Sequence, residues 1–126
     1  MKLKKLTVIV VIAFFAYIGT EPTAETSAQT GRWVIATAYC SCTKCCGDDA
    51  IGLFASGNRV YWGGVAADWR VFPRGTRLEM EGFSVPFRVE DTGRLVKGAH
   101  VDIWMPSHRQ AEEFGRQKLW ATISRL

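Results

Sequence analysis

The segment from residue 100 to 105 alternates strictly between two kinds of side chain, and this alternation constrains the fold more than any other feature. Its apolar side chains share one face of an extended strand: Val101, Ile103 and Met105. The remaining side chains share the opposite face: His100, Asp102 and Trp104. A strand with one apolar face and one polar or aromatic face belongs in a sheet that covers a core on one side.

Other short segments have strand composition and are separated by turn signals such as Gly57-Asn58 and Pro73-Arg74-Gly75. The expected strands are 32–39, 51–56, 65–68, 77–81, 85–90 and 118–124. Many short strands predict a mainly β fold, a small β-barrel. Three tryptophans are expected in its core: Trp33, Trp69 and Trp120.

One short helix is predicted near the C-terminus. Ser107 is a suitable N-cap, Gln110 stands three residues later, and Gly115 can end the helix.

Residues 1–28 have the order of a secretory signal. Residues 1–5 are basic, residues 6–19 form an apolar run, and Thr26-Ser27-Ala28 offers small residues for cleavage. The run is short for a membrane span, which needs roughly 20 apolar residues. We expect a signal peptide, with an uncleaved N-terminal anchor as the alternative, followed by one domain over residues 29–126. The protein is then secreted or associated with the cell wall, and an uncleaved segment would be its only membrane contact.

Removal of residues 1–28 takes away three of the 16 basic and two of the 12 acidic residues. The remaining 13 basic and 10 acidic residues give a net charge of +3, which suits a polyanionic neighbour such as a cell wall. The basic residues are scattered, so nucleic acid is not an expected partner. No glycine-rich phosphate loop is present, so a nucleotide is not expected. No other cofactor is predicted.

All four cysteines lie within seven residues: Cys40, Cys42, Cys45 and Cys46. Outside the cytoplasm this favours disulfides. Adjacent cysteines bond to each other only with strain, so the expected pairs are 40–45 with 42–46, or 40–46 with 42–45. A four-thiolate zinc site is the alternative, but the spacing is tighter than that of the usual paired knuckles. Disulfides, and no metal, are therefore the prediction, with free or mixed thiols as a third alternative.

Few residues after position 28 suit other kinds of catalysis. The only histidines are His100 and His108, and no serine stands in a nucleophile elbow, which leaves carboxylate chemistry. Asp91-Thr92-Gly93 matches the aspartic protease tripeptide, but the flanking Glu90 and Arg94 do not fit that family.

Several spaced motifs occur together in one order. They are Thr37-Ala38-Tyr39-Cys40, Cys45-Cys46-Gly47, Ala55-Ser56-Gly57, Val65-Ala66-Ala67-Asp68, Val71-Phe72-Pro73-Arg74-Gly75-Thr76, Glu90-Asp91-Thr92-Gly93, Lys97-Gly98 and His100-Val101-Asp102-Ile103-Trp104. Over residues 33–125 the chain resembles the 3D domain family, which is named for three aspartates. The resemblance implies a double-psi β-barrel and kinship with membrane-bound lytic transglycosylase A and small Gram-positive cell-wall enzymes.

The resemblance also implies roles for the aspartates. Asp102, eleven residues after Asp91, takes the position of the catalytic acid/base, and Asp91 and Asp68 take supporting positions. From the residues alone, Asp68 and Asp91 could equally hold turns by accepting backbone N–H bonds. Arg94 departs from the family, which usually has a second glycine there.

The expected activity is cleavage of the β-1,4 bond between N-acetylmuramic acid and N-acetylglucosamine, which leaves a 1,6-anhydro sugar. The expected partner is a peptidoglycan glycan strand, bound by a monomer. Five residues are substrate-binding candidates: Trp104, Thr92, Gly93, Lys97 and Trp62. The alternatives are a non-catalytic wall-binding or loosening module and a hydrolase with two carboxylates.

Overall fold

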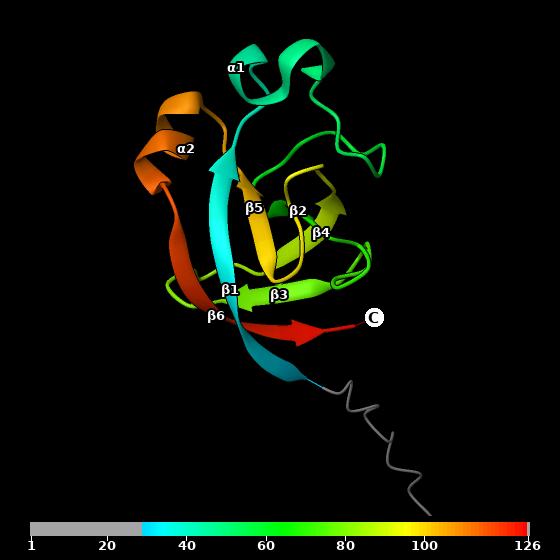
Figure 1. Cartoon of the computed structure of the whole chain (residues 1–126), viewed down its shortest axis with the longest axis vertical. Coiled ribbons are helices and arrows are strands. Elements are labelled where there is room, and N and C mark those ends of the chain that lie inside the picture. The colour runs from blue at the N-terminus through cyan, green and yellow to red at the C-terminus, as the bar shows by residue number, and fades with distance from the viewer. Residues whose placement is uncertain (1–28, 126) are drawn as a thin grey trace, which may run out of the picture.

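The computed structural model describes residues 29–125, which form a closed barrel of six strands (Figure 1). The strands are β1 (Thr30–Tyr39), β2 (Gly64–Ala67), β3 (Arg77–Met80), β4 (Phe87–Asp91), β5 (His100–Trp104) and β6 (Gln117–Ser124). Their order around the barrel is β1-β5-β2-β4-β3-β6. The pairs β1–β5 and β2–β4 are parallel and the other four are antiparallel. The predicted mainly β fold, a small double-psi barrel, is confirmed.

The predicted C-terminal helix is also confirmed, as α2 (His108–Phe114). The Ser107 hydroxyl accepts a hydrogen bond from the Gln110 N–H at 3.3 Å, and Gly115 ends the helix. Two short elements were not predicted: α1 (Thr43–Cys46) and the 3₁₀ turn η1 (Gly47–Asp49). None of the described helices has the length and apolarity required to cross a membrane. The expected signal peptide or anchor lies outside the described residues.

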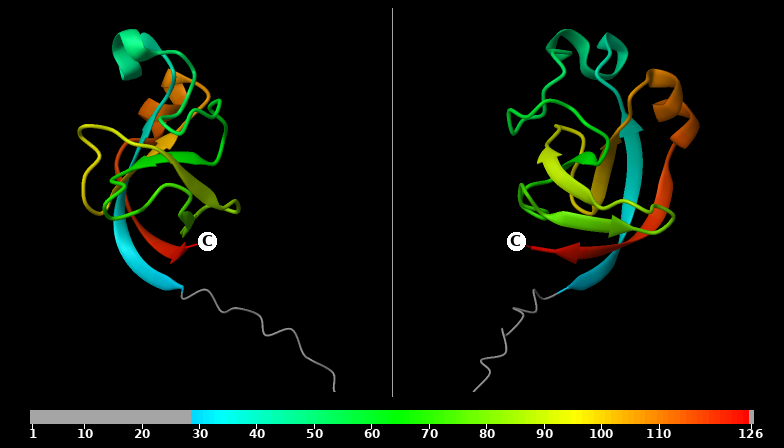
Figure 2. Two further views of the ribbon diagram at one scale, coloured as in Figure 1. Left: turned by 90° about the vertical axis from the view of Figure 1, so that its right-hand side faces the viewer. Right: turned by 180° about the vertical axis from the view of Figure 1, so that it is seen from behind.

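The strand predicted at 51–56 is wrong. This segment makes only an isolated bridge between Leu53 and Arg59. Gly52 has a φ of +70°, which turns the backbone away from an extended course, and Ile51 is 71% exposed. The segment is instead a loop that covers one end of the barrel (Figure 2).

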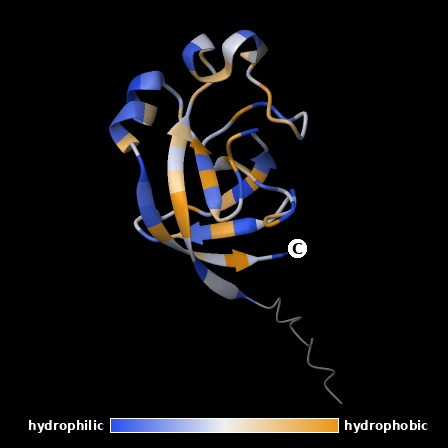
Figure 3. Ribbon diagram, in the orientation of Figure 1, coloured by the Kyte–Doolittle hydropathy of each residue, from blue (hydrophilic) through white to orange (hydrophobic). Residues whose placement is uncertain are grey.

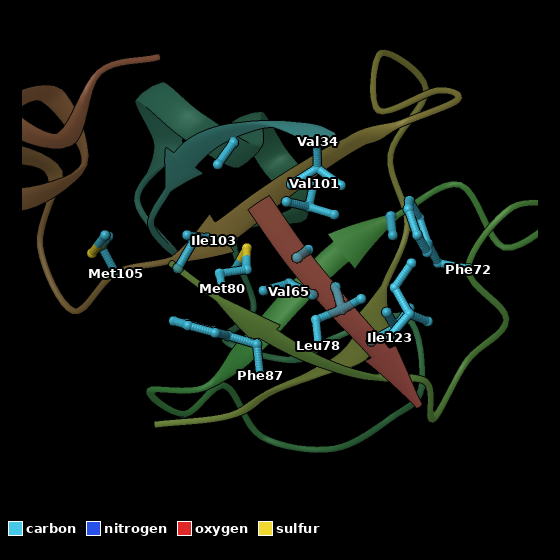
Figure 4. Packing of buried hydrophobic residues seen from close by; sticks show 14 of the residues in the cluster. Val34, Val65, Phe72, Leu78, Met80, Phe87, Val101, Ile103, Met105 and Ile123 are labelled. Atoms are coloured by element: carbon cyan, nitrogen blue, oxygen red, sulfur yellow. The ribbon is translucent and has the colours of Figure 1, made fainter. Parts of the chain in front are cut away.

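The barrel interior is filled by side chains that point inward from every strand (Figure 4). Its largest fully buried members are Phe72, Phe87, Leu78, Ile103, Val34, Val65, Val89 and Val101. Val101 and Ile103 occupy this core as the alternation of their segment predicts. Helix α2 adds little, because Ala111 is its only buried residue and most of the helix is hydrophilic (Figure 3).

The prediction that Trp33 and Trp120 lie in the core is wrong. They face each other across β1 and β6 with ring centroids 5.3 Å apart, and they are 50% and 41% exposed. Their neighbours Val34 and Ala121 take the inward positions, so alternation turns both indole rings outward. Trp69 is partly buried and packs against the core, as predicted.

Candidate functional site

A β-bulge between β2 and β4 decides which carboxylate reaches the outer face of the barrel. Val65 pairs with Val89, and the next residue, Ala66, pairs with Asp91 rather than with Glu90. Ala66 also pairs with Asp102 on its other side, in β5. Because paired residues point to the same face of a sheet, the bulge brings Asp91 to the face that carries Asp102. A regular strand would have placed Glu90 there.

Asp102 is partly buried on this face and is held from β1. Thr37, its partner in β1, donates a hydrogen bond from its hydroxyl to Asp102 Oδ1 at 2.7 Å. The Thr37 hydroxyl has only one proton, so it accepts from His100 Nε2, which lies 2.8 Å away. Burial raises the pKa of Asp102, the negative charge of Asp91 raises it further, and the bond from Thr37 opposes the shift. A raised pKa suits a carboxyl group that must hold and release a proton.

Asp91 is fixed by three donors. Tyr39 donates its hydroxyl to Oδ2 at 2.6 Å, and the backbone N–H groups of Ala55 and Thr92 donate to Oδ1 at 2.8 and 2.9 Å. Burial raises the pKa of Tyr39, and so does its bond to Asp91, which keeps the phenol a donor. The carboxylate therefore has a fixed position and is tied to β1 and to the 50–57 loop.

A cavity of about 480 Å³ opens beside Asp91. Its polar lining includes Tyr39, Ser41, Asp91 and Thr92, and its apolar wall comes from the 50–57 loop, including Phe54. Asp91 is the carboxylate in this lining. Asp102 lies outside it, on the same barrel face and two strand positions away, so that the two Cα atoms are separated by roughly 10 Å.

Asp68 has a different environment from the other two aspartates. Its side chain is 5% exposed and forms a 3.0 Å ion pair with Arg70, while the Gly98 N–H donates to Oδ2 at 3.1 Å. Arg70 and the Gly98 N–H hold the pKa of Asp68 well below its usual range. Its oxygens are occupied by these contacts and by the Arg70 backbone N–H, so the structure places Asp68 as an anchor for the loop before β5.

The two aromatic candidates for substrate binding lie at different cavities. Trp104 is partly buried on the Asp102 face, and its indole N–H donates to the Ser41 hydroxyl at 2.9 Å, beside the first cavity. Trp62 is 41% exposed, packs edge-on against Phe87, and lines a separate cavity of about 530 Å³ next to α2. Of these two tryptophans, only Trp104 lies close to Asp91 and Asp102.

The remaining candidates lie on the loop between β4 and β5. Thr92 is exposed and lines the first cavity, whereas Gly93 is partly buried and begins a turn closed by the Val96 N–H at 3.1 Å. Lys97 and the unusual Arg94 are exposed and line no cavity with Asp91. Thr92 is therefore the loop residue nearest to the site.

The sequence assigned no role to Thr37 or Tyr39, although Thr37 donates a hydrogen bond to Asp102 and Tyr39 donates one to Asp91. A signal was present, because Thr37 and Tyr39 alternate with the small residues Ala36 and Ala38 along β1. Their importance depends on the pairing of β1 with β5, which joins segments more than 60 residues apart.

The predicted disulfide pairs are not formed among the described residues, where the four cysteines are free thiols. The sulfur atom of Cys40 lies 3.1 Å from that of Cys42 and 3.4 Å from that of Cys45, distances longer than a bond. His108 joins this group from α2, with Nδ1 at 3.4 Å from the Cys45 sulfur. Cys46 is turned away, and its thiol donates to the Cys40 carbonyl at 3.2 Å.

Comparison with known proteins identifies the family of this chain. The family model of the 3D domain matches residues 63–126, a range that contains all three aspartates. The chain belongs to the 3D domain family. The putative cell wall shaping protein YabE of Bacillus subtilis (strain 168) is 32% identical over 100 residues. That alignment covers 75% of this 3D-domain chain and 23% of YabE, so the chain spans about a quarter of this relative.

Solved structures share the barrel of this 3D domain. MltA from E. coli superimposes with a TM-score of 0.51 and 21% identity, over 58% of this chain and 27% of MltA. A variant of the same E. coli lytic transglycosylase gives a TM-score of 0.51 and 19% identity, over the same shares of each chain. At these identities the likeness concerns the fold.

Proposed function

We propose that this 3D domain is an exported lytic transglycosylase that cleaves the β-1,4 bond between N-acetylmuramic acid and N-acetylglucosamine in peptidoglycan. The observation that carries the proposal is the state of Asp102, a partly buried carboxyl whose pKa is raised by burial and by Asp91. Such a group can be protonated when substrate binds and ionised later in the same turnover.

In the proposed reaction Asp102 acts twice. Protonated Asp102 donates its proton to the glycosidic oxygen, and the bond from that oxygen to C1 of the muramyl residue breaks. The resulting carboxylate accepts the proton of the muramyl 6-hydroxyl, whose oxygen forms the new bond to C1. N-acetylglucosamine leaves with a free 4-hydroxyl, the muramyl product carries a 1,6-anhydro ring, and Asp102 regains its proton.

The neighbouring residues have supporting roles in this mechanism. Asp91 keeps the pKa of Asp102 raised, and its charge also favours the positive charge that develops at C1. Thr37 orients the Asp102 carboxyl through the 2.7 Å bond. Trp104 and Thr92 offer a ring face and a hydroxyl to the sugars. Lys97, Gly93 and Trp62 do not line the cavity beside Asp91, and Asp68 holds the loop between β4 and β5.

The comparisons support the cell wall as the place of action. One relative is named a putative cell wall shaping protein, and the protein with the similar barrel is a lytic transglycosylase. The net positive charge and the expected export signal agree with a protein that meets an anionic wall outside the cytoplasm.

Product analysis tests the proposal. Purified sacculi are digested with the wild-type chain, with Asp102→Asn and with Asp48→Asn, and the soluble products are identified by mass spectrometry. Asp48 is an exposed aspartate of η1, so its substitution is a matched control. We expect 1,6-anhydromuropeptides from the wild type and the control, and a loss of about 10²–10⁴-fold or more with Asp102→Asn.

Three results would contradict the proposal. Products with reducing ends would identify a hydrolase, and binding to sacculi without any product would identify a wall-binding or loosening module. Anhydro products at the wild-type rate from Asp102→Asn would exclude Asp102 as the acid/base.

A further inference from the structure

Four metal-binding side chains meet at the end of the barrel where β1 stops. Cys40 follows β1, Cys42 caps α1, Cys45 lies within α1, and His108 is the first residue of α2. One ligand atom from each lies within 4.8 Å of all the others. Figures 1 and 2 show α1 and α2 at this same end of the barrel.

The separations between these atoms are close to the edges of a zinc tetrahedron. With Zn–S distances of about 2.3 Å, a tetrahedral site places two sulfur ligands about 3.8 Å apart and a nitrogen slightly closer to each sulfur. The Cys40 sulfur lies 3.1 and 3.4 Å from the sulfur atoms of Cys42 and Cys45, both shorter than this edge, so these sulfur atoms move slightly apart when they hold the ion. His108 Nδ1 lies 3.9, 3.5 and 3.4 Å from the sulfur atoms of Cys40, Cys42 and Cys45.

The histidine is oriented as a zinc ligand. Its other ring nitrogen, Nε2, lies 3.0 Å from Glu112 Oε1, one turn later in α2. A proton on Nε2 donates to this carboxylate and leaves the Nδ1 lone pair directed at the three sulfur atoms. Carboxylates that hold the outer nitrogen of a ligating histidine are a common feature of zinc sites. If the cysteines formed disulfides with one another, the contact between His108 and Glu112 would have no part in that arrangement.

The local backbone also brings two of these cysteines together in one turn. Cys42 and Cys45 have the C-x2-C spacing, and the N–H groups of Cys45 and Cys46 both donate to the Cys42 carbonyl, at 3.1 and 2.9 Å. Cys46 follows this turn but points elsewhere, since its thiol binds the Cys40 carbonyl. The arrangement therefore uses three of the four cysteines and adds a histidine that lies 63 residues after Cys45 in the sequence.

We propose that Cys40, Cys42, Cys45 and His108 bind one structural Zn²⁺, with Glu112 as the carboxylate behind the histidine. Four protein ligands leave no open coordination position, which is typical of a structural site. The ion joins the 40–46 loop to α2. That loop carries Ser41, which holds the indole of Trp104, and Ser41 and Cys46 line the cavity beside Asp91. Zinc thereby fixes one wall of that cavity, and the site stands whether or not the proposed catalytic function is correct.

Metal analysis of the full chain, purified with its thiols reduced and without chelator, tests the site. We expect one Zn²⁺ per chain. Replacement by Co²⁺ should give thiolate-to-metal charge-transfer bands and the visible absorption of tetrahedral Co²⁺. Cys42→Ser and His108→Gln should lose the ion. Cys46→Ser is the matched control and should keep it, because it makes the same change at a cysteine outside the cluster.

A second pair of variants avoids any loss of folding. Glu112 is 68% exposed, so Glu112→Gln should not disturb the barrel. It should weaken Zn²⁺ binding, measured by competition with a chromophoric chelator, by about 10–100-fold. The control Glu113→Gln changes the adjacent residue, which pairs with Arg109, and should leave the affinity unchanged.

Several outcomes would overturn the proposal. One is a reduced, folded protein that binds no Zn²⁺. Another is an exported protein whose intact mass is lower by four hydrogen atoms, which means two disulfides. Zinc lost in Cys46→Ser but kept in His108→Gln would indicate the four-thiolate site instead, and equal affinities of Glu112→Gln and Glu113→Gln would remove the role of Glu112.

Discussion

Asp91 and Asp102 belong to different strands, β4 and β5, and both pair with the same residue of β2, Ala66. This shared partner places the two carboxyl groups on one face of the barrel with a single small side chain between them. The negative charge of Asp91 thereby contributes to the raised pKa of Asp102, after the larger effect of burial. Replacement of Asp91 and replacement of Thr37, the two neighbours of Asp102, should therefore shift the pH–activity profile in opposite directions.

Asp91→Asn should move the basic limb of the pH–activity profile to lower pH. Removal of the negative charge makes ionisation of Asp102 easier, so the general acid loses its proton at a lower pH. The asparagine oxygen can still accept from the N–H groups of Ala55 and Thr92. The measurement is kcat/KM for release of anhydro products across pH, with Asp48→Asn as control. An unchanged basic limb would show that Asp91 does not influence Asp102.

Thr37→Val should move the same limb to higher pH. The Thr37 hydroxyl stabilises ionised Asp102 through its 2.7 Å bond, and valine has the same shape without a donor. Thr37→Ser keeps a hydroxyl and is the matched control, with a profile close to wild type. If the basic limb of Thr37→Val moved to lower pH, as expected for Asp91→Asn, the result would contradict the stabilisation of ionised Asp102 by Thr37.

Gly64→Ala should reduce both stability and activity, although Gly64 touches neither aspartate. A methyl group on Gly64 would overlap the ring of Phe54, which is 3% exposed and lines the cavity next to Asp91. Displacement of Phe54 also moves Ala55, whose N–H holds Asp91. We expect a loss of about 1–3 kcal/mol in the free energy of unfolding, measured by urea denaturation.

A double-mutant cycle checks this cause. Phe54→Leu makes room for the methyl group, so Gly64→Ala should cost less in the Phe54→Leu background than in the wild type. Equal costs in the two backgrounds would show that the overlap with Phe54 is not the reason.

The strand at 100–105 shows what the sequence alone could predict. Its alternation correctly assigned Val101 and Ile103 to the core and Asp102 to the outer face, because a sheet repeats every two residues. The same rule fails for Asp91. Counted from buried Val89, Asp91 would point inward, and only the bulge against Ala66 turns it outward. A bulge is a property of two paired strands, so the residues of one strand do not reveal it.

Contacts between segments far apart in the sequence also explain the other differences between the predictions and the structure. The spacing of the four cysteines could not indicate His108, which lies 63 residues after Cys45 and joins the cluster only because α2 packs beside β1. Trp33 and Trp120 are apolar enough for a core, but composition does not say which side of a strand faces inward. Their positions follow from Val34 and Ala121, which fill the interior.

Asp68→Asn should destabilise the domain at neutral pH and leave the activity of the folded fraction unchanged. The pKa of Asp68 is held below its usual range by Arg70 and by the Gly98 N–H, so the ionised group stabilises the folded state above the ordinary aspartate pKa. This stabilisation disappears as the pH falls through the lowered pKa. In urea denaturation, the difference between variant and wild type should therefore shrink on acidification. A difference independent of pH would indicate that charge is not involved.

Asp102→Asn should have the opposite effect and stabilise the domain. Burial raises the pKa of Asp102 in the folded state. Below the pKa of the unfolded state, the carboxyl is neutral in both states and does not lower the free energy of unfolding. As the pH rises through the raised pKa, the folded state must ionise a partly buried group, and stability falls. Asparagine avoids that ionisation and can still accept from Thr37. We expect a gain of roughly 0.5–2 kcal/mol at neutral pH, as is common when an active-site group is neutralised, and no gain in acid. Equal stability of variant and wild type at neutral pH would mean that Asp102 carries no unfavourable charge, and the acid/base role proposed for it would lose its physical basis.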